Sequence, residues 1–155
     1  MSMTDRDQLI DAIGRMIMRW QDATQKFDEM VGKIYDLNVS ERLCLSFLFH
    51  GPQTASRIAQ EVNLTPPAVT ALIDRLERRG FVRRRRDEGD RRKVLIEAAE
   101  KTEQLTAEVY GPVAKAGASM LAKFTETELQ LLQRLLAQSI ELQQKLTEDL
   151  MHRQD

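Results

Sequence analysis

The spacing of apolar positions predicts long helices at both ends of the chain. Over residues 5–35, apolar side chains recur every three or four positions, as in an amphipathic helix. A second stripe runs from residue 129 to about residue 151, after Thr125-Glu126-Thr127-Glu128, whose hydroxyl and carboxylate three residues apart form a capping box. The segment 102–123 is also helical in pattern. We expect Gly111-Pro112 to kink or split it, because proline lacks the backbone donor.

These apolar stripes are wide for a chain of 155 residues. A monomer has little surface with which to cover them, and symmetric dimers are the commonest homo-oligomers. We therefore expect the terminal segments, residues 1–35 and 99–155, to pack as dimerisation helices against a second copy of the chain. Packing of these helices onto the middle of the same chain is the alternative.

The middle of the chain, residues 36–98, is divided into short elements by turn residues. Ser40 is expected to cap a helix over residues 41–50, which stops at His50-Gly51-Pro52. A second short helix is expected over about 55–62. Asn63 then makes a tight turn, because asparagine tolerates a left-handed backbone.

A third helix is expected between Thr65, as its N-cap, and Gly80, with Pro66 at its first position. Its inward face consists of Val69, Leu72, Ile73 and Leu76. Two strands follow, at 81–86 and 93–97, joined by a turn that contains glycine. Two helices joined by a short turn and followed by a two-stranded ribbon make a winged helix-turn-helix. The predicted fold is mainly α with a small β-wing, in one structural domain.

The charge distribution adds a candidate function to this fold. The whole chain has a net charge of −1, but the stretch from Arg75 to Lys93 has ten basic and four acidic residues, a net +6. The rest has 13 basic and 20 acidic residues, a net −7. Such a concentration of positive charge predicts a surface that binds a polyanion. A solvated charged hairpin is the alternative.

Candidate DNA contacts lie on the exposed side of the third helix and on the ribbon. They are Thr65, Pro67, Ala68, Thr70, Ala71, Arg75, Arg84, Arg86, Arg91 and Arg92. The first turns of the helix have no Asn, Gln or Arg for bidentate base contacts, so thymine methyls and one hydroxyl must serve instead. Because side chains alternate along a strand, Arg84 and Arg86 form one set and Arg83 and Arg85 the other.

Several function classes are excluded by what the sequence lacks. The single cysteine, Cys44, cannot form an internal disulfide, and two histidines make a metal site improbable. We find no glycine-rich phosphate loop and no Cys/His or Ser/His pair at a useful spacing, so neither an enzyme nor a cofactor is expected. No apolar run approaches the ~18 residues of a membrane helix, and the start lacks the hydrophobic region of a signal peptide. We expect a cytoplasmic protein.

Three segments resemble the MarR (multiple antibiotic resistance regulator) family of bacterial transcription factors. They are residues 54–65 (TASRIAQEVNLT), 69–84 (VTALIDRLERRGFVRR) and 87–96 (DEGDRRKVLI). The resemblance implies a homodimer that binds pseudo-palindromic promoter DNA, in most cases as a repressor, and that is often released by a small phenolic or other lipophilic ligand. The alternative function is a winged-helix module for protein interaction, without specific DNA binding. After the wing, this chain departs from the family pattern, and Thr102 becomes a candidate cap of the next helix.

The resemblance also implies roles for individual residues. One of Arg91 and Arg92 enters the minor groove, and the other pairs with Asp90 to hold the wing turn. Arg75 contacts a phosphate or the groove; a pair with Asp74 or Glu77 is the alternative.

A ligand pocket is a further hypothesis, because methionine adapts to varied apolar shapes. Its candidate residues are Met16, Trp20, Phe47 and His50, and ordinary core packing is the alternative. Cys44 is expected to be a buried structural thiol.

Overall fold

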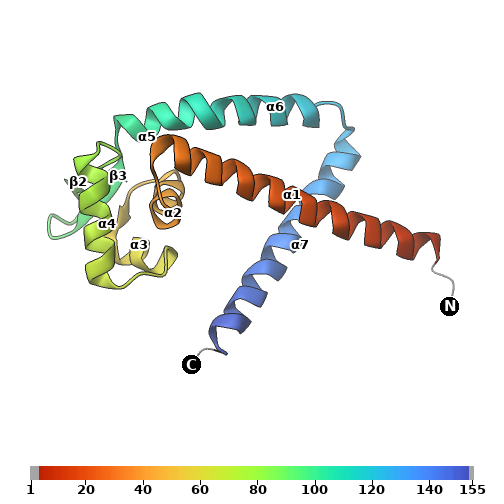
Figure 1. The fold of residues 1–155 in the computed structure, drawn as a ribbon, viewed down its shortest axis with the longest axis horizontal. Helices are drawn as coiled ribbons and strands as arrows, with labels where there is room; N and C mark the ends of the chain where they lie inside the picture. The colour runs from red at the N-terminus through yellow and green to blue at the C-terminus, as the bar shows by residue number, and fades with distance from the viewer. Residues whose placement is uncertain (1–3, 154–155) are drawn as a thin grey trace. The chain divides into compact units, whose positions relative to one another are not determined.

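The computed structural model describes residues 4–153 (Figure 1). The helices are α1 (Asp5–Tyr35), α2 (Val39–Leu48), α3 (Ala55–Glu61), α4 (Pro66–Arg78), α5 (Glu100–Leu105), α6 (Gly111–Leu121) and α7 (Glu126–Met151). A π-helical segment, η1, covers Thr106–Tyr110, and the strands are β1 (Gln53–Thr54), β2 (Val82–Arg86) and β3 (Val94–Ala98). The predicted fold class, mainly α with a small β-wing, is confirmed. The chain forms two compact units, one up to Val109 and one from Tyr110 onward.

Helix α1 has the bounds that the apolar stripe predicts. It begins with a capping box between Thr4 and Asp7. It ends at Asp36, whose left-handed backbone (φ 52°) lets its amide donate to Gly32 O. Val31 and Gly32 are its buried residues, so most of the apolar stripe is exposed in the single chain.

Helix α2 begins earlier than predicted, because the N-cap is Asn38 and not Ser40. The Asn38 side chain accepts the Glu41 amide at 2.9 Å, and the Glu41 carboxylate accepts the Asn38 amide at 2.8 Å. This reciprocal pair satisfies two free amides at once, which a lone serine hydroxyl cannot do. The helix also ends earlier, at Leu48, and the chain then turns through Gly51 at φ +120°.

Helices α3 and α4 follow the predicted order. Asn63, in the turn between them, has φ 51°, as expected. Thr65 is the N-cap of α4, but its side chain makes no capping hydrogen bond. Pro66 and Pro67 occupy the first two helical positions, and Pro67 removes one of the two amides that an N-cap hydroxyl can bind. Gly80 ends the helix region at φ +79°.

The predicted pair of strands, β2 and β3, forms the wing, and a short strand β1 that was not predicted extends it to a three-stranded antiparallel sheet in the order β1-β3-β2. Strands β2 and β3 pair from Val82↔Ala98 to Arg86↔Val94. The short strand β1 adds Gln53↔Ile96 and Thr54↔Leu95. Two residues are too few to carry an alternating pattern, so this strand depends on its neighbour for its existence.

The core of the first unit lies between α2, α3, α4 and the sheet. The predicted inward face of α4 is buried, with exposed fractions of 3% or less at Val69, Leu72, Ile73 and Leu76. Cys44 is also fully buried, and burial raises the pKa of its thiol to about 12. The thiol is therefore protonated at physiological pH, as expected for a structural cysteine.

Thr102 is not a helix cap, contrary to the prediction. Helix α5 begins after Ala99, and Thr102 lies inside it with its side chain buried. Its hydroxyl donates to the Phe81 carbonyl at 2.5 Å, and the Ala99 amide donates to the same carbonyl at 2.9 Å. Thr102 thus joins α5 to the start of the wing, where Phe81 is fully buried.

The helical segment around Gly111-Pro112 is irregular, as expected. The π-helical residues Thr106–Tyr110 directly precede this pair, and proline cannot donate the next amide of a regular α-helix. Helix α7 then begins at the predicted capping box, in which the hydrogen bonds from Thr125 lower the pKa of Glu128.

No described residue of α7 is buried in the single chain. Its large exposed apolar side chains are Leu131, Leu135, Leu136, Ile140, Leu142, Leu146, Leu150 and Met151. Within residues 4–153, no helix is long and apolar enough to cross a membrane.

Candidate nucleic-acid interface

The N-terminal half of α4 presents a small, weakly polar surface. Thr65, Pro67, Thr70 and Ala71 are exposed there, and Ala68 is half-buried, so the predicted contact residues lie together. The Thr70 hydroxyl donates to the Pro66 carbonyl at 3.0 Å. Such a surface can contact thymine methyl groups but offers no bidentate hydrogen bonds to a base edge.

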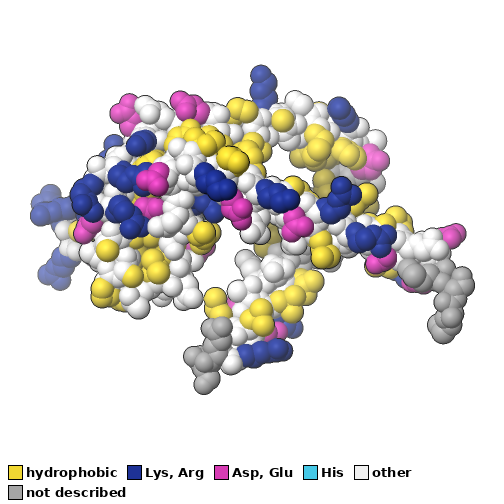
Figure 2. All heavy atoms as spheres, in the orientation of Figure 1, with side chains coloured by type: hydrophobic (Ala, Val, Ile, Leu, Met, Phe, Trp, Pro, Cys, Tyr) yellow, Lys and Arg dark blue, Asp and Glu magenta, His cyan; other side chains and the backbone are white. Residues whose placement is uncertain are grey.

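Basic side chains gather over the wing and the neighbouring α4, at the left of Figure 2. Six of the ten cations between residues 75 and 93 lie within 4 Å of a carboxylate of the same unit: Arg75, Arg79, Arg83, Arg84, Arg85 and Lys93. Among the described residues, by contrast, the exposed side chains of Arg86, Arg91 and Arg92 have no hydrogen-bond or ion-pair partner. These three guanidinium groups are free to meet a phosphate or a groove.

The wing turn is held by two carboxylates that bind backbone amides. Asp87 Oδ1 accepts from the amides of Gly89 (2.9 Å) and Asp90 (2.7 Å). Asp90 Oδ1 accepts from the Arg92 amide at 3.1 Å. Asp87 was missed in the sequence, although an aspartate two residues before a turn glycine is a known signal for such a turn.

The predicted ion pair between Asp90 and an arginine is absent from the described wing. The carboxylate instead lies 3.9 Å from the Lys93 ammonium. Because Asp90 bonds to an amide only two residues further along, its carboxylate stays close to the backbone of the turn. Arg91 and Arg92 thus both keep their guanidinium groups free.

The two faces of β2 have different roles, as their alternation predicts. Arg83 Nε and Arg85 Nε donate to the two oxygens of Glu97, at 2.7 and 2.6 Å, and these hydrogen bonds lower the pKa of Glu97. On the other face, Arg84 donates to Asp74 Oδ1 at 2.5 Å and also pairs with Glu77, both on α4. Arg84, a predicted DNA contact, therefore links the wing to α4, the second helix of the helix-turn-helix.

Arg75 has a different carboxylate from the two that the sequence suggested. Its Nε donates to Glu41 Oε1 on α2 at 2.7 Å, whereas Asp74 and Glu77 bind Arg84. Glu41 is 34 positions away in the chain, so no local pattern indicates this pair.

Arg57 is a further candidate contact that the sequence analysis missed. It is exposed on α3, and its side chain has no partner among the described residues. The first helix of a helix-turn-helix crosses the DNA backbone, which places a cation there near phosphate. Arg57 lies outside the basic stretch, so the charge count did not single it out.

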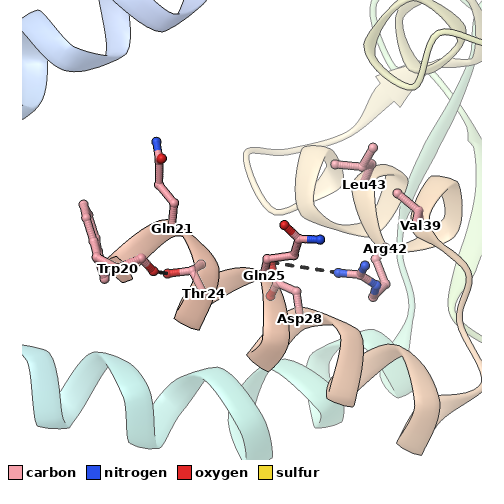
Figure 3. Close-up of a pocket in the computed structure, with 8 residues that line it drawn as sticks. All are labelled: Trp20, Gln21, Thr24, Gln25, Asp28, Val39, Arg42 and Leu43. Carbon is pink, nitrogen blue, oxygen red and sulfur yellow. Dashed lines mark hydrogen bonds and ion pairs between the residues drawn. The ribbon is translucent and has the colours of Figure 1, made fainter. Parts of the chain in front are cut away.

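An open groove of about 430 Å³ lies between α1 and α2 (Figure 3). It is lined by Trp20, Gln21, Thr24, Gln25, Asp28, Val39, Arg42 and Leu43. Of the four predicted pocket residues, Trp20 lines this groove and the other three do not.

The remaining three lie elsewhere in the first unit. Met16 is exposed on α1, Phe47 packs against the core, and His50 lies exposed with its ring edge-on to Phe49. Among residues 4–153, no three His, Cys, Asp or Glu side chains come together as a metal site.

Comparison with known proteins identifies the family. The family model that describes the MarR family matches residues 39–94. YhbI of Bacillus subtilis, described as an uncharacterized HTH-type transcriptional regulator, is 33% identical over 131 residues, which cover 83% of this chain and 82% of that protein. A second regulator of B. subtilis, YcgE, is 30% identical over 100 residues, or 64% of this chain and 65% of its own length.

A solved structure agrees with these sequence matches. A MarR family protein from Bacillus stearothermophilus has a TM-score of 0.61 and 26% sequence identity, over 94% of this chain and 99% of that one. The wing and the helix-turn-helix of this chain are the elements expected for the family that the relatives indicate. The chain therefore belongs to the MarR family of winged helix-turn-helix, DNA-binding transcription regulators.

Proposed function

We propose that the protein is a cytoplasmic transcriptional repressor that binds pseudo-palindromic promoter DNA as a homodimer. The observation that carries the proposal is the set of three free arginines, Arg86, Arg91 and Arg92, beside a recognition helix with a small exposed surface. The wing turn is preset by Asp87 and Asp90, so little conformational entropy is lost when it meets DNA. The exposed apolar side chains of α7 support the homodimer.

The proposal is tested by selecting duplexes from a random-sequence pool with the purified protein and measuring their affinity at several salt concentrations. We expect a selected palindrome and a steep fall of affinity with salt, because bound cations displace counterions from DNA. A protein that binds every duplex weakly would favour the alternative, a winged-helix module for protein interaction. Repression itself is tested with a reporter gene placed behind the selected site.

Loss of a wing arginine should weaken this binding. We expect Arg91→Ala and Arg92→Ala each to lower affinity for the selected duplex about tenfold, within the ~1–3 kcal/mol of a specific contact. The variant that has lost a phosphate contact should also reduce the slope of log affinity against log salt by about one. Arg19→Ala, which removes an exposed arginine from α1, is the matched control and should change neither quantity. Unchanged binding in both wing variants would contradict the wing assignment.

The recognition helix should depend on thymine methyl groups. Replacing thymine by uracil in a half-site should cost roughly fourfold in affinity for each buried methyl, or about 0.8 kcal/mol. The reason is that the exposed residues in the N-terminal half of α4 offer methyl and ring carbons and no bidentate donors. The same replacement outside the half-sites serves as the control in a competition assay. Indifference to every replacement would show that α4 recognises its site in another way.

Release by a small lipophilic ligand is part of the proposal and is supported by the groove between α1 and α2. Trp20, Val39 and Leu43 offer apolar contacts there, and the Arg42 guanidinium lies 3.9 Å from Asp28. A ligand with an aromatic ring and an acidic group suits such a lining. Quenching of Trp20 fluorescence by a panel of phenolic acids, and release of the selected duplex by the same compounds, test this part.

A further inference from the structure

Glu41 is the one charged residue that is buried among residues 4–153, with 2% of its surface exposed. Its two carboxylate oxygens have different tasks. Oε2 accepts the Asn38 amide and completes the capping box that begins α2. Oε1 accepts Arg75 Nε of the recognition helix at 2.7 Å and lies 3.8 Å from Arg79 Nη1.

Arg79 extends this contact to the end of α1. Its Nη1 donates to the Asp36 carbonyl and its Nη2 to the Tyr35 carbonyl, both at 2.7 Å. The guanidinium carbon also lies 5.2 Å from the centre of the Phe81 ring. Glu41, Arg75 and Arg79 therefore connect the end of α1, the start of α2 and the last turns of α4.

A buried charge needs good partners, because removing a carboxylate from water is costly. Well-packed apolar side chains of similar volume often stabilise a protein as much as a buried ion pair does, so stability is a weak explanation of this arrangement. The two oxygens of this one carboxylate instead accept directional hydrogen bonds from α4 and from the start of α2, and these bonds define how α4 lies against α2. The position of α4 determines which base edges it meets.

We propose that Glu41 and Arg75 are positioning residues that set the orientation of the recognition helix for sequence-specific DNA binding. In this proposal Arg75 acts on DNA through the placement of α4 and does not itself neutralise a phosphate. The inference rests on the DNA binding proposed above. It changes the role that the sequence suggested for Arg75.

The two roles of Arg75 predict different dependence on DNA sequence and salt. A phosphate contact contributes to every duplex, and its loss lowers the salt slope by about one. A positioning residue contributes to the selected duplex, because a displaced helix still meets phosphate but no longer meets the correct bases. The decisive quantity is the ratio of affinities for the selected duplex and for a scrambled duplex of equal length.

The experiment uses the full-length chain with Glu41→Gln, Arg75→Met and both changes together. Glutamine keeps the size of glutamate, and its carbonyl oxygen can still accept the Asn38 amide. Its NH₂ group then faces Arg75 Nε, so two donors meet where a donor and an acceptor met. Arg78→Met is the matched control: it removes the same charge from the same helix, and the Arg78 Nε contacts only the Asp74 carbonyl.

We expect each single variant to reduce the affinity ratio about tenfold, and the double variant to be no worse than the poorer single variant. Affinity for the scrambled duplex and its salt slope should be the same in Glu41→Gln as in the unaltered protein. Arg78→Met should leave the ratio unchanged, whatever it does to overall affinity. If circular dichroism shows that Glu41→Gln is unfolded, the affinity ratio and the salt slope of Arg75→Met test the inference instead.

Three results would overturn the inference. The first is that Arg75→Met lowers the salt slope by about one on both duplexes while the ratio of affinities for the selected and scrambled duplexes stays unchanged. The second is an unchanged ratio in folded Glu41→Gln, and the third is a double variant whose loss is the product of the two single losses. Failure of the proposed function has a different signature, because the unaltered protein would then select no duplex at all.

Discussion

Deletion of residues 129–155 is expected to abolish the proposed dimer and to lower affinity for the selected duplex at least about a hundredfold. Nothing in the described part of α7 is buried in the single chain, yet eight large apolar side chains lie along it. A second copy would cover this surface, and monomers would lose the advantage of binding two linked half-sites, which is worth about 10²–10⁴ in affinity. Sedimentation velocity measures the assembly, and fluorescence anisotropy measures the affinity.

Deletion of residues 152–155 alone is the matched control, because α7 ends at Met151. This shorter chain should remain a dimer and bind normally. Thermal unfolding checks that the first unit, which has its own core, is intact in the longer deletion. A dimer that persists without residues 129–155 would show that other helices hold the two copies together.

A single charge on the apolar surface of α7 tests the same interface without removing any chain. Ile140 is 58% exposed in the single chain, so Ile140→Glu should leave a monomer's fold intact. If the second copy covers this position, burying the new carboxylate is costly and the dimer should weaken. Gln138→Glu, on an exposed polar position of the same helix, is its control.

Insertion of five base pairs between the half-sites should be as damaging as the deletion, again by at least about a hundredfold. Half-sites one helical turn apart, about 34–36 Å, face the same side of the duplex, and half a turn moves one of them to the opposite side. A dimer with fixed recognition helices can then engage only one half-site. The loss should far exceed that of any single thymine methyl.

An insertion of ten base pairs separates two explanations of such a loss. This insertion returns the second half-site to the same side of the duplex as the first but increases the distance between the two half-sites. A rigid dimer should bind this duplex as poorly as the first one, whereas a flexible dimer should recover. Equal affinity for all three spacings would contradict binding by two linked recognition helices.

Elements with a long local pattern were predicted well from the sequence. The bounds of α1, Asp5–Tyr35, agree with the apolar stripe, and the inward face of α4 is buried as expected. Both results follow because helical periodicity is a property of neighbouring residues. The start of α2 was predicted wrongly at Ser40, although Asn38 and Glu41 have the spacing of a capping box and the local pattern could have given it.

Elements that exist only through distant contacts were missed or misassigned. Strand β1 has two residues and depends on pairing with β3, more than 40 positions later in the chain. Thr102 was a candidate cap because the chain departs from the family pattern after the wing, but its hydroxyl donates to the Phe81 carbonyl in the core. A local pattern contains no information on which distant carbonyl lies nearby.

The sequence by itself determined the winged helix-turn-helix, its basic stretch and its family, because periodicity, turn residues and motif spacing are all local. Only the tertiary structure decided which of the ten cations are free. Glu41 holds Arg75, Asp74 and Glu77 hold Arg84, and Glu97 holds Arg83 and Arg85, while Arg86, Arg91 and Arg92 remain available. The physical reason is that an ion pair depends on distance in space, and folding alone brings these carboxylates within hydrogen-bond reach of their arginines.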